Sequence, residues 1–97
     1  MLIVTGSVTA RPDTFEALRE AALAHTRRSR TEPGCRRHSV HVDCEDPLTL
    51  FFYEEWEDRP ALDAHFAQDG SHAFMAAVRD LAARSGKIRI LPIQPRM

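Results

Sequence analysis

The segment over residues 48–56 constrains the fold more than any other part of the chain, because it is hydrophobic on both of its alternating faces. Successive side chains of a β-strand point to opposite sides of a sheet. Leu50 and Phe52 therefore fall on one side, while Phe51 and Tyr53 fall on the other. A sheet built around this strand needs a cover over each face, and helices of one chain can cover only one of them.

Three other segments have the pattern of strands. Residues 2–8 are β-branched and apolar, residues 35–44 alternate between polar and apolar positions, and residues 88–91 close the series. The sequence Glu-Asp-Pro at residues 45–47 forms a turn between the second strand and the two-faced third strand. We therefore expect a hairpin in the middle of the chain, with one further strand before it and one after it.

The segment after the first strand has the spacing of an amphipathic helix. Apolar side chains recur at intervals of three and four, as at Leu18 and Ala22. We expect this helix to begin under an Asp13 cap and to run to about Arg30. The sequence Glu-Pro-Gly at residues 32–34 stops it, because proline disfavours a helical residue before it and glycine permits the turn.

A second helical segment follows the third strand and is broken in the middle. It is expected to start at Asp58, with Pro60 in its first turn, and to be interrupted at residues 68–70. Ser71 can cap the continuation, which we expect to end at Gly86. The order β-α-β-β-α-β with a broken second helix predicts an α+β sandwich of the ferredoxin-like type.

Chain length supports one domain over residues 1–97. A chain of 97 residues buries about 60–65% of the surface that its unfolded form exposes, which is enough for one core. A ferredoxin-like sheet has helices on one face and leaves the other face bare. Since the third strand is apolar on both faces, we expect a homodimer that packs through the bare sheet face.

Charge and composition exclude several function classes. The net charge of −1 argues against a nucleic-acid partner, because binding to phosphates needs a concentrated positive field. No apolar run approaches the roughly 20 residues of a membrane span, and the first residues read as a strand and not as a signal peptide. Two cysteines are too few for a disulfide framework, so we expect a cytoplasmic protein without a membrane partner.

Cys35, His38, His41 and Cys44 have a spacing that superficially suggests zinc. On a regular strand, however, Cys35 and His41 point to one side while the other two point to the opposite side. Ligands divided between two faces cannot converge on one tetrahedral ion. We therefore expect ordinary strand residues here and no metal site.

A basic cluster lies between the first helix and the second strand. Its members are Arg27, Arg28, Arg30, Arg36 and Arg37. Such a cluster can attract an anionic ligand. Charges in this position are more often the solvated end of a helix, where they also interact favourably with the helix dipole. We expect the solvated role.

Glu54, Trp56, His65 and His72 form the strongest candidate for a functional group. Glu54 and Trp56 project to one face of the third strand, which makes Glu54 a carboxylate in an apolar layer if that face lies under the helices. His65 lies on the inner stripe of the following helix and can reach it. His72 lies in the first turn of the next helix, where the dipole favours a neutral imidazole. The group fits a general base with a carboxylate partner, and equally a structural pair that ties helix to sheet.

Several motifs together resemble the antibiotic biosynthesis monooxygenase family. They occur in the family's order and cover nearly the whole chain: Glu32-Pro33-Gly34-Cys35, Tyr53-Glu54-Glu55-Trp56, Ala61-Leu62-Asp63-Ala64-His65 and Ser71-His72-x-Phe74. The resemblance implies a ferredoxin-like fold and a dimer whose two sheets form a shared α/β barrel. It is less specific for the reaction, because the family includes oxygenases of anthrones and quinols, haem-degrading enzymes and an isomerase of a phosphorylated quorum signal.

Departures from the family patterns narrow the choice. The haem-degrading branch has an asparagine on its first strand, and this sequence contains no asparagine. The anthrone branch often has asparagine four residues before the strand-end tryptophan, where Phe52 stands here. The usual tyrosine after the Gly-Cys turn is His38. The resemblance therefore leaves the substrate open.

The leading hypothesis is a cofactor-independent monooxygenase that oxidises a small aromatic, such as a quinol, an anthrone or a related polyketide, with O₂ as co-substrate. His65 or His72 would be the base, and Glu54 would orient the imidazole. The expected substrate-binding residues are Trp56, Phe52, His38 and Phe74. Neither flavin nor metal is expected, because the substrate supplies the electrons.

Two alternatives stay open. The same histidine and carboxylate could shuttle a proton in the isomerisation of a small oxygenated metabolite, and a phosphorylated substrate would then need the arginine cluster near the pocket mouth. The chain could also be a non-catalytic dimeric ligand-binding accessory protein, because a fold does not guarantee a function.

Overall fold

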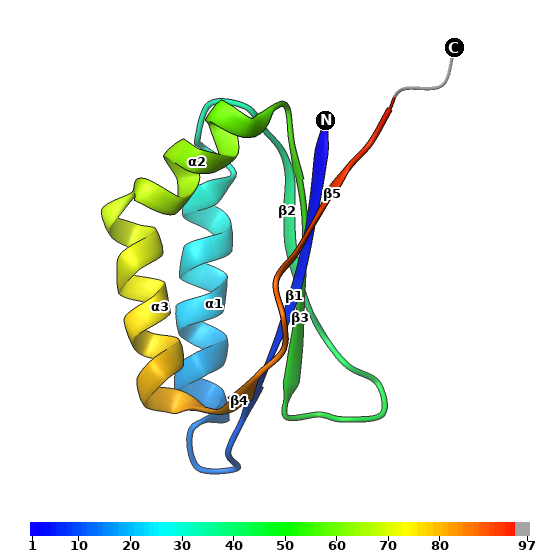
Figure 1. The fold of residues 1–97 in the computed structure, drawn as a ribbon. Coiled ribbons are helices and arrows are strands. Elements are labelled where there is room, and N and C mark those ends of the chain that lie inside the picture. Colours follow the sequence, from blue (N-terminus) through cyan, green and yellow to red (C-terminus); the bar gives the residue numbers. More distant parts are fainter. Residues whose placement is uncertain (95–97) are drawn as a thin grey trace.

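The chain folds into one antiparallel sheet with helices over one of its faces, as the computed structural model shows for residues 1–94, the part of the chain that it describes (Figure 1). Its strands are β1 (Leu2–Ala10), β2 (Cys35–Val42), β3 (Thr49–Trp56), β4 (Ala82–Ser85) and β5 (Arg89–Pro92). Its helices are α1 (Phe15–Ser29), α2 (Arg59–Ala67) and α3 (Asp69–Leu81). The α+β class and the ferredoxin-like order are confirmed, and the expected break in the second helix lies between α2 and α3.

The sheet has the order β2-β3-β1-β4, and β5 also pairs with β1. β4 pairs with residues 8–10 of β1 and β5 pairs with residues 2–5, so the two short strands follow one another along the same edge. Between them the backbone N–H of Gly86 donates to the carbonyl of Ser7 over 2.8 Å. β5 corresponds to the expected last strand, whereas β4 is a further short strand over residues that were expected to be helical, and the two are separated opposite the middle of β1.

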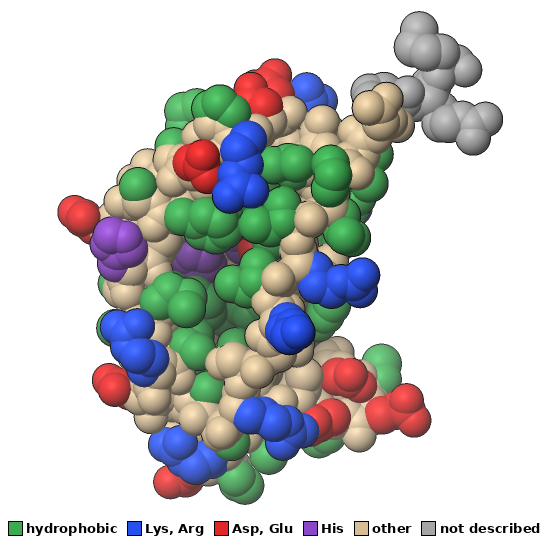
Figure 2. All heavy atoms as spheres, in the orientation of Figure 1, with side chains coloured by type: hydrophobic (Ala, Val, Ile, Leu, Met, Phe, Trp, Pro, Cys, Tyr) green, Lys and Arg blue, Asp and Glu red, His purple; other side chains and the backbone are tan. Residues whose placement is uncertain are grey.

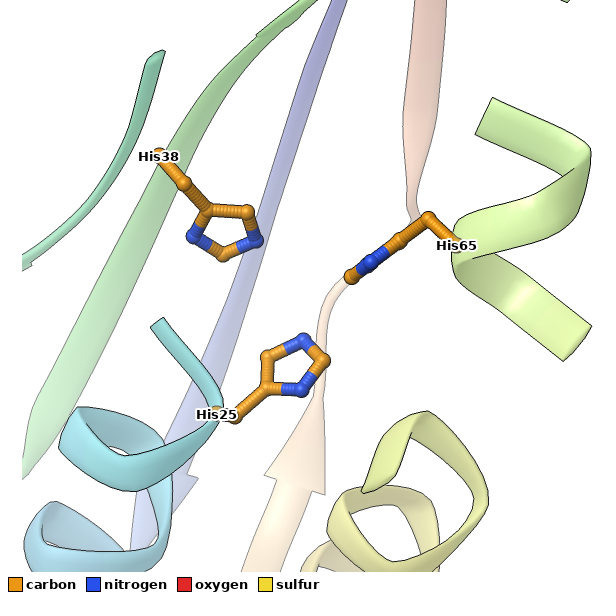
Figure 3. A group of neighbouring side chains, drawn as sticks. All are labelled: His25, His38 and His65. Atoms are coloured by element: carbon orange, nitrogen blue, oxygen red, sulfur yellow. The ribbon is translucent and has the colours of Figure 1, made fainter. Parts of the chain in front are cut away.

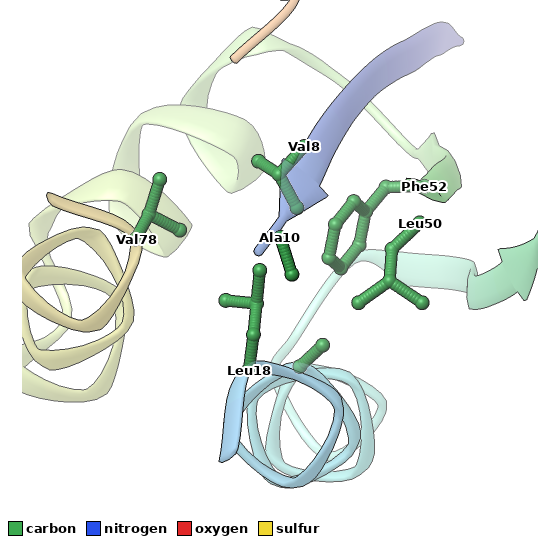
Figure 4. Close-up of a cluster of buried hydrophobic side chains, with 7 residues drawn as sticks. Val8, Ala10, Leu18, Leu50, Phe52 and Val78 are labelled. Carbon is green, nitrogen blue, oxygen red and sulfur yellow. The ribbon is translucent and has the colours of Figure 1, made fainter. Parts of the chain in front are cut away.

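The apolar core lies between α1, α3 and the inner sides of β1 and β3 (Figure 4). Inward positions of β1 and β3 meet the buried stripe of α1, because paired residues of neighbouring strands point to the same face. The core consists of Val8, Ala10, Leu18, Ala22, Leu50, Phe52 and Val78. A smaller cluster of Val4, Trp56 and Leu62 closes the other end of the sheet beneath α2.

Helix α3 ends at Leu81, before the expected Gly86, and the chain then enters β4. Ala82 is already extended, with φ −84° and ψ 142°. The guanidinium of Arg11 donates to the carbonyls of Asp80 and Ala82, each over 3.3 Å, and so satisfies carbonyls at this helix end. The expectation failed because residues 82–85 find strand partners on β1, which a local helix pattern cannot reveal.

The helix caps agree with the sequence at one place and differ at two. Asp58 caps α2 as expected, because its carboxylate accepts from the N–H of Ala61. The residue before α1 is Thr14 and not Asp13, and the Thr14 hydroxyl donates over 2.7 Å to the carbonyl of Leu81, at the end of α3. Ser71 lies inside α3 and donates to the carbonyl of His65 over 2.6 Å, so it holds α2 against α3 instead of capping a helix.

Strand β2 contains an irregularity that changes which side chains share a face. Its register against β3 shifts between Cys35 and Arg37, so that Cys35 pairs with Trp56 and His38 pairs with Glu54. Cys35 and His38 therefore lie on the same, helix-covered face, and the expectation that they point apart is wrong. His41 pairs with Phe51 on the other face and Cys44 lies beyond the strand, so the four residues still do not converge.

The other sheet face is mixed in character and is not covered by a helix (Figure 1). Phe51 is 42% exposed there, and the phenol of the half-buried Tyr53 donates to Glu55 over 2.7 Å. Thr5 and Ser7 of β1 stand opposite these aromatics, so this face is more polar than the third strand alone indicates. None of the helices within residues 1–94 is both long enough and apolar enough to cross a lipid bilayer.

Candidate functional site

Three buried histidines from three different elements meet under the helix layer (Figure 3). His25 comes from α1, His38 from β2 and His65 from α2, and one ring nitrogen of each lies within 4.8 Å of the others. The rings are 5.1 to 5.6 Å apart between centroids. Glu54 and Trp56 of β3 border the same cluster.

Local structure explains why each ring reaches this point. The buried side of α1 reads Leu18, Ala22, His25 and Ser29, so His25 continues the apolar stripe at the same helical spacing. The shifted register of β2 brings His38 opposite Glu54 on the inner face. His65 occupies the last turn of α2.

His65 is held by a carboxylate that the sequence analysis treated only as part of a helix stop. Its Nδ1 lies 2.9 Å from Oε1 of Glu32, and a carboxylate can only accept, so Nδ1 donates the hydrogen bond. The lone pair of a neutral ring then resides on Nε2, which faces Glu54 at 4.0 Å. Glu32, and not Glu54, thus fixes the tautomer and the orientation of His65.

Glu54 is a buried carboxylate with several positive or donating neighbours. Burial favours its neutral form, but His38, the indole of Trp56 and His65 together outweigh burial and hold the pKa of Glu54 below its usual value. The Trp56 indole N–H donates to Oε1 over 2.8 Å. Nε2 of His38 lies 3.4 Å from Oε2, an electrostatic contact whose geometry falls short of a hydrogen bond.

His25 is held neutral by its surroundings. Burial, followed by the neighbouring His38 and His65 and by Arg28, lowers its pKa to about 3. The guanidinium Nη2 of Arg28 lies 2.6 Å from Nδ1, which must therefore accept. On its other side the ring stacks on Phe74, with a centroid distance of 4.5 Å.

Several polar atoms of this network lack hydrogen-bond partners within the described residues. They are both ring nitrogens of His38, Nε of Arg28 and Oε2 of Glu32. Nε of Arg28 and Oε2 of Glu32 lie 3.9 Å apart, so these two charged groups attract one another without a hydrogen bond. A buried polar group without a partner is costly, which marks the network as a site kept for more than stability.

A cavity of about 210 Å³ opens beside the network. Its walls are mostly apolar and come from β1, β3, α3 and the segment between β4 and β5, whereas His25, Glu54 and His65 contribute polar atoms. Figure 2 shows this hollow, with hydrophobic side chains around the opening and histidine atoms at its bottom. Phe66, Met75 and Ile88 line it and are each more than a third exposed.

Four of the predicted site residues line this cavity and three do not. Phe52, Glu54, His65 and Phe74 line it as expected. Trp56 and His38 are buried behind the lining and contact the carboxylate and the imidazoles instead of the cavity. His72 is exposed on α3 and is not among the lining residues, so it does not join His65 and Glu54.

The sequence patterns did not indicate His25, Arg28 or Glu32 as site residues. His25 could have been found from its place in the spacing 18, 22, 25, 29 along one helix face. Arg28 was expected to be solvated, but it lies between His25 and Glu32. No residue of the arginine cluster lines the cavity, within the chain as far as the structure describes it.

Sequence comparison assigns the chain to a family. A sequence model described as antibiotic biosynthesis monooxygenase matches residues 1–77. The chain belongs to the antibiotic biosynthesis monooxygenase family. The uncharacterized protein sll1783 of Synechocystis sp. is 33% identical over 92 residues, which make up 95% of this chain and 63% of that protein. This chain therefore spans less than two thirds of the curated relative that it matches.

Solved structures share the family fold. A protein from Deinococcus radiodurans, described as a candidate antibiotic biosynthesis monooxygenase, has a TM-score of 0.93 at 23% identity, over 100% of this chain and 96% of its own. Rv0793 from Mycobacterium tuberculosis has a TM-score of 0.89 at 26% identity, over 98% and 96%. PA3566 from Pseudomonas aeruginosa has a TM-score of 0.86 at 29% identity, over 97% and 94%. These three structures thus share the arrangement of sheet and helices that this chain has.

Proposed function

We propose that this chain is a monooxygenase that oxidises a small, electron-rich aromatic with O₂. One observation carries the proposal: Nδ1 of His65 is bound to Glu32 over 2.9 Å, so that the free Nε2 belongs to a residue that lines an apolar cavity. A fixed imidazole with a free lone pair is a general base for a phenol or an activated carbon. Membership of the family supports the same class of reaction.

The proposed reaction begins when His65 removes a proton from the substrate. The resulting anion passes one electron to O₂, and the two radicals combine at the activated carbon. For a quinol, the activated ring carbon gains one oxygen atom and the ring, which loses two hydrogens overall, becomes a hydroxyquinone, while the second oxygen atom leaves as water with those two hydrogens. The substrate supplies all the electrons, so the proposal includes no flavin and no metal.

The size of the cavity favours a small substrate. An apolar cavity of about 150 Å³ is enough for benzene, and the cavity here is about 210 Å³. One ring with small substituents fits that volume, whereas a fused tricycle would have to extend past the mouth. The ring centroids of Phe52 and Phe74 lie 5.5 Å apart in an edge-to-face arrangement, and the two rings form one aromatic wall of the cavity. We therefore favour a quinol over an anthrone.

An oxygen electrode tests the proposal directly. Hydroquinones with one ring, naphthohydroquinones and an anthrone are each added to the protein in air and under nitrogen, with autoxidation subtracted. We expect O₂ uptake above background and an oxygenated product for the smaller members, and no product without O₂. Product formation that does not depend on O₂ would indicate the isomerase alternative, and binding without product would indicate the accessory protein. Either outcome contradicts the proposal.

The isomerase of a phosphorylated metabolite has lost its main support. That alternative needed the arginine cluster at the pocket mouth, and none of those arginines lines the cavity, as far as residues 1–94 are concerned. Arg28 instead donates to His25 inside the network. The accessory-protein alternative keeps the same geometry and differs only in the outcome of the oxygen experiment.

Pairing of two chains through the uncovered sheet face is part of the proposal. Phe51 and Leu91 are 42% and 36% exposed on that face and are expected to meet a second copy. Sedimentation velocity at micromolar concentration tests this, with Phe51→Asp expected to give monomers, since an unpaired charge in an apolar contact is costly. Val42→Asp is the control, because Val42 is 47% exposed at the sheet edge and should leave the dimer intact. A monomeric native chain would refute the pairing.

A further inference from the structure

We propose that His25, His38 and His65 bind a divalent transition-metal ion, of the zinc or cobalt type, with Glu54 as a fourth ligand. The three imidazoles come from three elements and point toward one another (Figure 3). All three are buried, with exposed fractions of 6% for His25, 1% for His38 and 2% for His65. Imidazole nitrogens with one carboxylate are a ligand set that suits zinc and its neighbours.

Distances place the ligand atoms within reach of one ion. Bonds of about 2.1 Å put the ligand nitrogens of a tetrahedral ion about 3.4 Å apart, and those of the three histidines lie within 4.8 Å of one another. Small inward movements of the rings close that gap. The Glu54 carboxylate already spans two of them, at 3.4 Å from His38 and 4.0 Å from His65.

His38 supplies a second and independent observation. Its side chain is fully buried, and neither of its ring nitrogens has a hydrogen-bond partner among the residues that the structure describes. The desolvation of these two nitrogens is offset only by the electrostatic contact between Nε2 and Glu54. Coordination of an ion by one of these nitrogens would remove that cost, and Glu54 stands directly beside it.

The charges of the network also favour a cation. Glu32 and Glu54 are carboxylates and Arg28 is a guanidinium, so with all three imidazoles neutral, which is the form that ligates a metal, the network carries one excess negative charge. Glu32 already holds Nδ1 of His65 in the manner of a carboxylate behind a metal-bound histidine. The His65 ring is therefore already oriented as a ligand before an ion binds.

Arg28 is the group that must move. It donates to Nδ1 of His25, and the hydrogen of that ring is then on Nε2. When Arg28 swings toward Oε2 of Glu32, 3.9 Å away, both atoms gain the hydrogen bond that they lack. His25 is then free to rearrange its proton and to ligate. Arg28 thus opposes the ion in two ways, by its charge and by its hold on His25.

This inference goes beyond the proposed function and is tested without an activity assay. An ion on Nε2 of His65 would occupy the lone pair that proton transfer requires, so metal binding and general-base catalysis exclude one another at that atom.

Protein without a polyhistidine tag is treated with a chelator and titrated with Co²⁺, and the visible absorption is recorded. We expect one ion per chain, displaced by Zn²⁺. A folded chain that takes up no Co²⁺ at micromolar concentration would overturn the inference.

Two variants on the same strand form a matched pair. His38→Gln should weaken Co²⁺ binding by about 100-fold or more, because loss of a ligand should cost at least as much as loss of a supporting group. His41→Gln should stay within about twofold, because His41 is exposed on the opposite face. Equal losses in both variants would overturn the site.

Arg28→Gln should strengthen binding by about tenfold or more, because it removes a positive charge beside the ion. Weaker binding in this variant would contradict the inference. The native chain offers a further measurement that needs no substitution, since it has five histidines. On addition of Zn²⁺, the imidazole NMR signals of His25, His38 and His65 should shift while those of His41 and His72 stay in place. Shifts confined to the two exposed histidines would overturn the inference.

Discussion

The two ends of the interface between α1 and the sheet differ in chemistry although the same helix face builds both. At one end Leu18 and Ala22 are fully buried and pack against apolar strand residues. One turn further, His25 and Ser29 are also buried, but the His25 ring meets other imidazoles, and the Ser29 hydroxyl donates to the His25 carbonyl. One side of α1 is therefore buried along its whole length, although its side chains are apolar at one end and polar at the other.

The apolar end stabilises the fold, whereas the polar end carries the candidate functional groups. The apolar end gains free energy because seven buried side chains and five partly buried neighbours are removed from water, with no polar side-chain atom to satisfy. The polar end removes charged and polar groups from water, which is costly, and leaves some of them without partners. Burial without compensation is tolerated where a ligand or a reaction needs the group. We therefore expect substitutions at the two ends to affect different measurements.

The largest expected effect belongs to the polar end. His65→Ala should lower turnover of an accepted substrate by about 10²–10⁴-fold, because it removes the proposed general base. Steady-state O₂ uptake measures this. His72→Ala is the control and should retain nearly full turnover, since His72 is exposed and does not line the cavity. Full turnover in both single variants and in the double variant would remove the proton-transfer mechanism.

The next effect belongs to the apolar end. Leu18→Ala should lower the free energy of unfolding by about 2–5 kcal/mol, because it leaves a cavity in a packed core, and Leu18 has 0% exposure. Urea denaturation followed by circular dichroism measures the change. Val42→Ala, at a position that is 47% exposed, should stay within about 0.5 kcal/mol. Similar losses in the two variants would mean that this end does not carry the stability.

A smaller effect sharpens the assignment of Glu32 as a positioning residue. Glu32→Gln should lower turnover by about 10–100-fold, since the amide holds the ring less firmly and can stabilise the wrong tautomer. Glu57→Gln is the control, because Glu57 is exposed and pairs with Arg36 outside the network. The ¹⁵N shifts of His65 should show the tautomer change in the first variant alone. An unchanged tautomer in Glu32→Gln would contradict the role.

The smallest effect concerns the two thiols. Burial, followed by the nearby charges of Glu54 and Glu32, raises the pKa of Cys35 to about 11. At pH 8 about one Cys35 in a thousand is then a thiolate, the reactive form, and the fraction rises as pH approaches 11. Iodoacetamide at pH 8 should therefore label the exposed Cys44 and spare Cys35. Mass spectrometry of the labelled peptides checks this, and faster labelling of Cys35 would contradict the described surroundings.

Local patterns were enough to predict the fold and half of the candidate site. The spacing of Leu50, Phe52 and Glu54 fixes their common face, and that face does lie under the helices. Glu32 was out of reach, because its meeting with His65 joins residues that are 33 positions apart in sequence. The prediction for His72 was wrong for a simpler reason. Helix α3 begins at Asp69 and buries the side that carries Ser71 and Val78, so His72 lies on the exposed side. Pairings that depend on how elements pack cannot be read from the period of a single element.

The interruption between β4 and β5 makes the rim of the cavity adjustable. Ser85, Gly86 and Ile88 form part of the cavity wall, and Ile88 is 55% exposed. The family match ends at residue 77, so this wall lies outside the segment that defines the family. Ile88 belongs to neither apolar cluster, so its side chain can change in size there, whereas a Cβ at Gly86 would come within 2.5 Å of the Ser7 hydroxyl. Selection for a new substrate thus has a place to act on specificity at little cost in folding.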